Sequence, residues 1–170
     1  MQDHVDFVVG QWGKAMPELD ASSMEVFGRM LRLLKHLAKV RAQAMAPFGF
    51  REGEFDVLAT LRRAGEPYSL SPTQLYKSLL ITSGAMTNRL NHLEQQGLIV
   101  RISDPDDKRS TRVSLTPHGR RLIEQALVVH TATQNSLLEN LSHAQREQLS
   151  SLLRQVLLTF PAEEIATNTQ

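Results

Sequence analysis

The sequence predicts a mainly α-helical fold with one small β-hairpin, and three observations lead to this prediction. Apolar residues recur every three or four positions over most of the chain, which is the spacing of an amphipathic helix. Ser71-Pro72 and Thr116-Pro117 each place a hydroxyl residue directly before a proline, a pattern typical of a helix start. Between residues 98 and 115 apolar residues instead alternate with their neighbours, which is the period of a strand.

Two short helices are expected between residues 71 and 97. Ser71 can accept a hydrogen bond at the start of the first helix, and Gln74 can reach back to the N–H of that cap. The second helix is expected to begin at Thr82 or Ser83. It should end at Gly97, because glycine readily takes the left-handed conformation that follows a last helical turn.

One face of the second helix carries small and amide side chains. At about 100° per residue, Met86, Leu90 and Leu93 fall together and are expected to face a core. Asn, Gln and Thr on the opposite face can donate and accept hydrogen bonds, as the base edges of the DNA major groove require. A merely polar surface is the alternative. The residues of this face are Gly84, Thr87, Asn88, Asn91 and Gln95.

Two strands are expected to follow. In the first, Leu98, Val100 and Ile102 alternate with other residues and are expected to form its buried face. In the returning strand, Val113 and Leu115 alternate in the same way. Each strand therefore has one face to bury, as a hairpin packed on helices requires.

The loop between these strands, DPDDKRS at residues 104–110, carries a basic tip at Lys108 and Arg109, and Arg112 follows it. A cationic tip beside the second helix can contact phosphates or enter a minor groove. The aspartates argue against phosphate attraction alone, and at least one is expected to hold Arg109 or Arg112. Helix, turn, helix and hairpin in this order form the winged helix-turn-helix arrangement.

Three motifs carry a family resemblance: TSGAMTNRLNHLEQQGLIVR, DPDDKRS and VSLTPHG. Their most specific parts are the LEQQGLIVR junction between helix and strand and the run Asp107-Lys108-Arg109. Together they closely resemble the MarR family of bacterial transcriptional regulators, and the flanking helices fit as well. The resemblance implies a ligand-responsive regulator, expected to be a repressor, that binds a palindromic operator in double-stranded DNA as a homodimer.

Amphipathic helices flank the winged-helix core on both sides. They carry more leucine than a domain of this size needs for its own core, so a twofold partner is expected to cover the remaining apolar face. A monomer with a larger helical core is the alternative. We expect N-terminal dimerisation helices with a possible ligand site in residues 1–50, the DNA-binding core in 51–116, C-terminal dimerisation helices in 117–160 and a mobile tail in 161–170.

The residues expected to contact DNA fall into three sets, and for each residue plain surface exposure is the alternative. Base edges are expected to meet Thr87, Asn88 and Asn91, with Ser83 and Gly84 close to phosphate or base edges. The DNA backbone is expected to meet Ser71, Thr73, Gln74 and Thr82 at the helix starts. The hairpin is expected to place Lys108 and Arg112 on phosphates, and the resemblance assigns Arg109 to the minor groove.

Trp12, Asp56, Arg89 and Arg101 together resemble the residue set of the urate-responsive branch of the MarR family, which has an extra N-terminal helix. That resemblance implies that a flat anion such as urate is held between the dimerisation helices and the DNA-binding lobe, and that it loosens DNA. Two arginines can pair an anion and an aromatic ring can cover it. The alternatives are another aromatic or carboxylate ligand, an ion pair between Asp56 and Arg89, and a core role for Trp12.

Other classes of function find little support in the sequence. The six histidines show no HxxxH or HExxH spacing, and neither a nucleophile elbow nor a phosphate loop is present, so no enzyme, metal or cofactor is expected. The chain has no cysteine, which excludes thiol sensing.

No apolar run approaches the roughly 20 residues that span a bilayer, and no signal-peptide pattern opens the chain, so a cytoplasmic protein is expected. A helical adaptor or a DNA-associated protein without ligand response is the remaining alternative.

Overall fold

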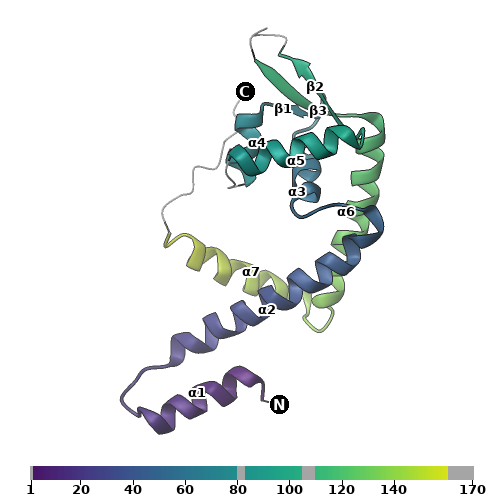
Figure 1. Cartoon of the computed structure of the whole chain (residues 1–170). Helices are drawn as coiled ribbons and strands as arrows, with labels where there is room; N and C mark the ends of the chain where they lie inside the picture. Colours follow the sequence, from purple (N-terminus) through teal and green to yellow (C-terminus); the bar gives the residue numbers. More distant parts are fainter. Residues whose placement is uncertain (1, 80–82, 105–109, 161–170) are drawn as a thin grey trace. The chain divides into compact units, whose positions relative to one another are not determined.

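The computed structural model describes residues 2–79, 83–104 and 110–160 (Figure 1). As predicted, the fold is mainly helical with a small antiparallel sheet. In chain order the elements are α1 (His4–Ala15), α2 (Ser22–Met45), the 3-10 helix η1 (Ala46–Phe48), α3 (Glu54–Arg63), β1 (Ser69–Leu70), α4 (Pro72–Leu79), α5 (Ser83–Gln95), β2 (Ile99–Ser103), β3 (Thr111–Leu115), α6 (Pro117–Leu137) and α7 (His143–Leu157).

The chain divides into two compact units, Met1–Ala44 and Met45–Gln170. The first contains α1 and nearly all of α2, and the second contains the sheet and the remaining helices. The four-part division expected from the sequence stays a prediction, and its tail, residues 161–170, lies outside the described residues. Among the described helices, none combines the length and the apolar character that crossing a bilayer requires.

In the first unit, two aspartates at the start of α1 form ion pairs with an arginine of α2. The side chain of Asp3 accepts hydrogen bonds from the backbone N–H groups of Val5 and Asp6, at 2.7 and 3.1 Å. Arg29 of α2 donates to the same two aspartates, at 2.8 Å from Asp3 and 2.5 Å from Asp6. The N–H of Asp6 and the guanidinium of Arg29 hold the pKa of Asp3 below its ordinary value. Val5 packs directly on Gly28, where an added Cβ would lie 3.1 Å from its methyl group.

In the second unit, β3 lies at the centre of a three-stranded sheet of order β1-β3-β2, with antiparallel pairing on both sides. Val113 and Leu115 of β3 are 0% and 8% exposed, which confirms the face predicted for this strand. The sheet packs on the helices of this unit, whose apolar faces meet in a common core. The fully buried residues at this centre include Leu58, Leu61, Leu75, Leu93 and Ile123.

The buried face of β2 is the opposite of the one predicted. Val100 and Ile102 are each 42% exposed, whereas Ile99 is 2% exposed. Ile99 lies opposite Leu115 of β3, so it shares the inner face of the sheet. Leu98 is also buried, but it precedes the strand and belongs to the turn after α5. Because apolar residues occupy successive positions here, the period alone could not fix which face turns inward.

Local capping explains where three helices of the second unit begin. Ser71 accepts a hydrogen bond from the N–H of Gln74 at 3.2 Å, and Gln74 returns the bond to the N–H of Ser71 at 2.8 Å. Ser142 and Gln145 repeat this reciprocal pair at the start of α7. Thr116 caps α6 and also donates to the carbonyl of residue 97 at 2.7 Å. The starts predicted at Ser71 and Thr116 are therefore confirmed.

An ionic cluster joins α3 to α6. Glu124 accepts hydrogen bonds from Arg62 at 2.7 Å and from Arg120 at 3.1 Å. The guanidinium groups of both arginines also lie over the ring of Tyr68, 5.0 and 4.7 Å from its centre. Arg120, and then Arg62, hold the pKa of Glu124 below its ordinary value. The cluster therefore fixes α6 beside α3.

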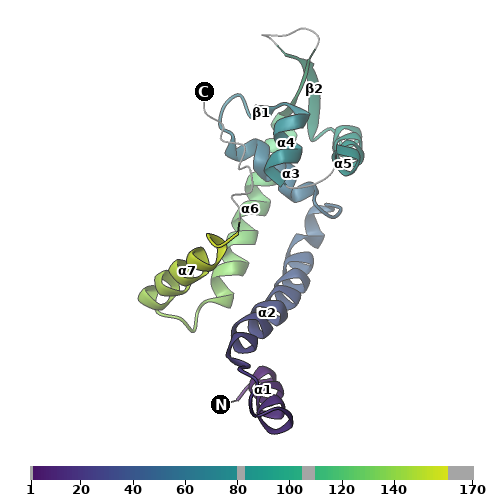
Figure 2. The ribbon, with the colours of Figure 1, turned by 90° about the vertical axis from the view of Figure 1, so that its left-hand side faces the viewer.

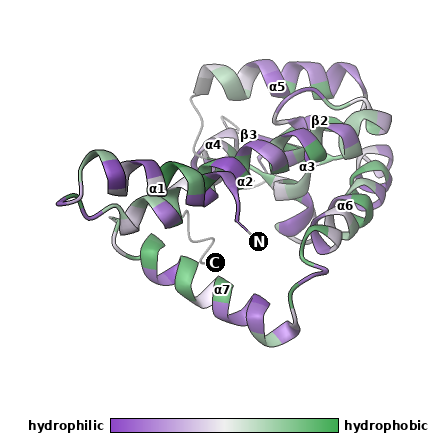
Figure 3. Cartoon of the chain, turned by 90° about the horizontal axis from the view of Figure 1, so that it is seen from below, coloured by the Kyte–Doolittle hydropathy of each residue, from purple (hydrophilic) through white to green (hydrophobic). Residues whose placement is uncertain are grey.

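Large apolar side chains remain exposed on α7, where hydrophobic segments are visible in Figure 3. Leu149 and Leu153 are 39% and 37% exposed, and Leu152 and Leu157 are 51% and 69% exposed. Apolar surface of this extent is unusual on a chain that stays alone in water.

Candidate nucleic-acid interface

Helix α5 presents its polar face to solvent and its apolar face to the core. Met86 and Leu90 are each 2% exposed and Leu93 is 0% exposed, which confirms the inward face predicted from the period. Figure 2 shows α5 beside the hairpin formed by β2 and β3. All five residues of the predicted outward face are exposed: Gly84, Thr87, Asn88, Asn91 and Gln95.

A buried polar contact fixes α5 to the start of α3. The Nδ1 atom of His92 on α5 lies 2.5 Å from Oε1 of Glu54, and the Glu54 side chain is only 3% exposed. The other carboxylate oxygen of Glu54 accepts a hydrogen bond from the backbone N–H of Arg51 at 2.9 Å. Sequence reasoning missed Glu54 and His92, because the period of a helix does not distinguish a glutamate that is buried with a partner from a solvated one.

The side chain of Arg89 provides a second contact between the same helices. Its guanidinium lies directly on Gly53, which precedes α3 with φ +77°. A Cβ at Gly53 would be 2.2 Å from Cζ of Arg89, so only glycine leaves room for this approach. Arg89 is half-buried and has no ion-pair partner within the described residues.

The hairpin is joined to α5 through Arg101 of β2. Its Nη1 atom lies 2.5 Å from the carboxylate of Glu94, and its backbone N–H donates to the same group at 3.2 Å. Its Nη2 atom donates to Oδ1 of Asn91 at 2.8 Å. Arg101 therefore reaches the outward face of α5, close to a residue predicted to read bases.

At the base of the hairpin, Asp104 holds Arg112 at 3.3 Å. Arg112 also donates to the backbone carbonyl of Ser69 at 2.9 Å. An aspartate of the loop therefore secures an arginine, as predicted, and Arg112 ties the hairpin to β1. Lys108 and Arg109 lie outside the described residues.

The residues predicted at the helix starts have differing surroundings. Ser71 and Gln74 are half-buried and bonded to each other, whereas Thr73 is exposed in the first turn of α4. Gly84 is exposed at the start of α5. Thr82 and the side chain of Ser83 lie outside the described residues.

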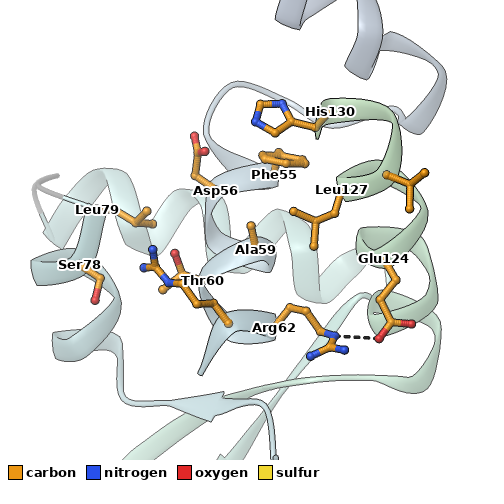
Figure 4. Close-up of a pocket in the computed structure, with 12 residues that line it drawn as sticks. Phe55, Asp56, Ala59, Thr60, Arg62, Ser78, Leu79, Glu124, Leu127 and His130 are labelled. Atoms are coloured by element: carbon orange, nitrogen blue, oxygen red, sulfur yellow. Dashed lines mark hydrogen bonds and ion pairs between the residues drawn. The ribbon is translucent and has the colours of Figure 1, made fainter. Parts of the chain in front are cut away.

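Asp56 lines a cavity of about 700 Å³ in the second unit. Figure 4 shows that α3, α4 and α6 all contribute to its wall, and that Phe55 and His130 lie ring to ring at one end. The centres of these rings are 4.8 Å apart. Thr60 and Arg63 of α3 line the same cavity.

The four predicted ligand residues do not all meet at this cavity. Arg89 and Arg101 are not part of its lining, and Trp12 belongs to the first unit. Asp56 and Arg89, both described, do not form the ion pair considered as an alternative. Across residues 2–79, 83–104 and 110–160, no three His, Asp or Glu side chains gather in the manner of metal ligands.

Comparison with known proteins places these features in a family. A MarR family model matches residues 48–110. The chain is 34% identical over 152 residues to the HTH-type transcriptional regulator PecS of Dickeya dadantii, and the match covers 89% of this chain and 92% of PecS.

Two solved structures share the fold. A mutant of MarR from E. coli, complexed with operator DNA, has a TM-score of 0.67 and 26% identity, and the match covers 86% of this chain and 97% of that one. BpsR of Bordetella bronchiseptica, whose DNA binding is regulated by 6-hydroxynicotinic acid, has a TM-score of 0.63 and 27% identity, and the match covers 76% of this chain and 91% of that one. The chain therefore belongs to the MarR family, whose members are DNA-binding transcriptional regulators and not enzymes.

Proposed function

We propose that the chain is a cytoplasmic repressor that binds a palindromic operator as a homodimer and leaves it when a small anionic or aromatic ligand binds. The observation that carries this proposal is the outward face of α5. Small hydroxyl and amide side chains are exposed there, while the opposite face is buried in the core. The complex of the E. coli relative with operator DNA supports the same use of this fold.

The dimensions and chemistry of α5 suit a DNA major groove. The helix has 13 residues and is therefore about 20 Å long, and a groove about 12 Å wide admits a single helix. Thr87, Asn88 and Asn91 are the residues that we propose for base contacts. Ser83 and Gly84 lie at the helix start, where we propose contacts with phosphate or base edges.

The phosphate contacts are proposed for the residues around α5. Ser71, Thr73, Gln74 and Thr82 precede it, and Lys108 and Arg112 belong to the hairpin. Arg109 is proposed for the minor groove, whose negative potential attracts a guanidinium.

The apolar surface that the described residues leave exposed supports a twofold dimer. Leu152 and Leu157 of α7 are 51% and 69% exposed, and in the first unit Phe27, Leu31 and Leu34 of α2 are 50%, 69% and 59% exposed. The three residues of α2 recur at helical spacing, so they form one stripe. A second copy would cover such surfaces, and twofold symmetry would place two α5 helices about one turn of DNA, roughly 34 Å, apart.

The DNA-binding proposal is tested by selecting bound duplexes from a random pool. Wild-type protein should enrich a palindrome. Asn88→Ala should change which bases are preferred, because it removes an amide from the reading face. Arg109→Ala should weaken binding to every duplex alike, because a minor-groove or phosphate contact carries little sequence information. Equal loss on all sequences from Asn88→Ala would contradict its role in reading bases.

For the ligand, we propose that Asp56, Arg89 and Arg101 contribute together with Trp12, and that urate is the first candidate. Arg89 has a half-buried guanidinium without an ion-pair partner in the described part of the chain, so an anion would supply the missing charge. Asp56 lines a cavity with aromatic rings at one end. The regulation of BpsR by 6-hydroxynicotinic acid supports a flat, acidic effector.

Binding of the ligand should weaken operator binding by about 5- to 150-fold, the usual range of coupling between two sites. Titration with urate and related aromatic anions measures this effect on the selected duplex. Arg89→Ala and Trp12→Ala should abolish it, whereas Arg121→Ala, which changes an exposed arginine of α6, should leave it intact. A urate response that is unchanged in both Arg89→Ala and Trp12→Ala would show that these residues do not bind the ligand.

A further inference from the structure

The amide of Asn91 is held in one orientation by the hairpin. Its Oδ1 atom accepts a hydrogen bond from Nη2 of Arg101 at 2.8 Å. Arg101 is itself held by Glu94, which binds its Nη1 atom at 2.5 Å and its backbone N–H at 3.2 Å. Asn91 is exposed on the outward face of α5, so this contact lies within the surface proposed to meet DNA.

The chemistry of the guanidinium decides which end of the amide faces Arg101. An arginine side chain has five N–H donors and no acceptor, so only the oxygen of Asn91 can bond to it. The NH2 group of Asn91 is therefore directed away from Arg101. The edge formed jointly by Asn91 and Arg101 presents donors on both sides of a single engaged oxygen.

We infer that Arg101 determines base specificity through Asn91, an inference that rests on the proposed function. An asparagine that is free to use both ends of its amide pairs with adenine, which offers N7 as an acceptor and N6 as a donor. With one lone pair of the Asn91 oxygen used by Arg101, the N6 donor of adenine could reach only the other lone pair and would lie beside the donors of the guanidinium. Guanine offers two acceptors, O6 and N7, on the same edge and fits this surface. The base opposite Asn91 in each half-site is therefore guanine.

A purely structural role for Arg101 makes a different prediction. The ion pair with Glu94 joins β2 to α5 whether or not the amide of Asn91 is oriented. If this were its whole role, replacing Arg101 would lower stability or overall affinity without changing the base preferred at any position. The preference at one position is therefore the measurement that separates the two roles.

The test is duplex selection from a random pool without ligand, because Arg101 is also a proposed ligand residue. Wild-type protein should prefer guanine at one position of each half-site by about 10-fold, the scale of one good base contact. Arg101→Met should move this preference toward adenine, and Arg101→Lys, which retains a donor, should keep guanine. Adding Asn91→Ala to Arg101→Met should abolish the preference. Thermal unfolding of each variant provides the control for folding.

Three results would overturn the inference. Arg101→Met could select the same bases as the wild type, or Asn91→Ala alone could enrich the wild-type site unchanged. If Arg101→Met does not fold, Glu94→Ala replaces it, because Arg101 then loses the carboxylate that holds it beside Asn91. The third contradicting result would be a guanine preference in Glu94→Ala as strong as that of the wild type. A wild-type protein that enriches no sequence would instead contradict the proposed function, and this inference with it.

Discussion

Replacing Gly119 with alanine is expected to lower the free energy of unfolding by about 3 kcal/mol, the upper part of the range for a side chain forced into a packed interior. A Cβ at Gly119 would lie 1.9 Å from the carbonyl oxygen of Leu98 and 2.8 Å from its carbonyl carbon. These are backbone atoms and cannot rotate away. The same oxygen accepts a hydrogen bond from the N–H of Thr116 at 3.1 Å, so moving it would also disturb the start of α6.

Urea unfolding of the full chain measures this effect, and Gly10→Ala provides the matched control. Gly10 lies within α1, and a Cβ there meets no atom within 4 Å. Alanine is the better helix former by up to about 1 kcal/mol, so this variant should be as stable as the wild type or slightly more stable. Equal stability of the two variants would show that α6 does not approach Leu98 as closely as described.

The second large effect is expected from His92→Ala, which should cost about 3 kcal/mol at neutral pH. The Glu54 side chain is 3% exposed and would lose its contact at 2.5 Å with the His92 ring. It would keep the N–H of Arg51, which does not compensate a buried carboxylate fully. Because this contact fixes α5 to α3, the variant should also bind the selected duplex more weakly.

His143→Ala is the matched control for the loss of a histidine beside a glutamate. His143 lies 3.4 Å from Glu147, but the two side chains are 87% and 69% exposed. Exposed pairs contribute little, so this substitution should change the free energy of unfolding by less than about 1 kcal/mol. Comparable losses from His92→Ala and His143→Ala would contradict the importance of burial at Glu54.

The parts of the fold that follow from local chemistry could be predicted from the sequence. Ser71 and Thr116 begin helices because the hydroxyl of each accepts a hydrogen bond from the backbone N–H three residues later. The inward face of α5 could be predicted because its apolar residues, such as Met86 and Leu90, repeat at helical spacing. Neither feature requires knowledge of distant segments.

The contacts that orient α5 could not be predicted, because each joins residues that are polar and unremarkable in the sequence. Glu54 meets His92 across 38 positions, and Arg101 reaches Asn91 only after the chain has turned into β2. The prediction that Val100 and Ile102 form the buried face of β2 was wrong, because this too depends on a distant segment. Pairing with β3, and not the local pattern, decides which side of β2 faces the core.

The proposed binding of duplex DNA uses α5 and the hairpin tips of a dimer. Its most direct test is the affinity of the full chain for the selected duplex, measured by fluorescence anisotropy between 50 and 200 mM salt. A dimer that contacts about 6–10 phosphates should lose affinity by roughly 10³- to 10⁵-fold over this range. An affinity that stays level across the series would contradict the claim and favour a helical adaptor that does not use DNA.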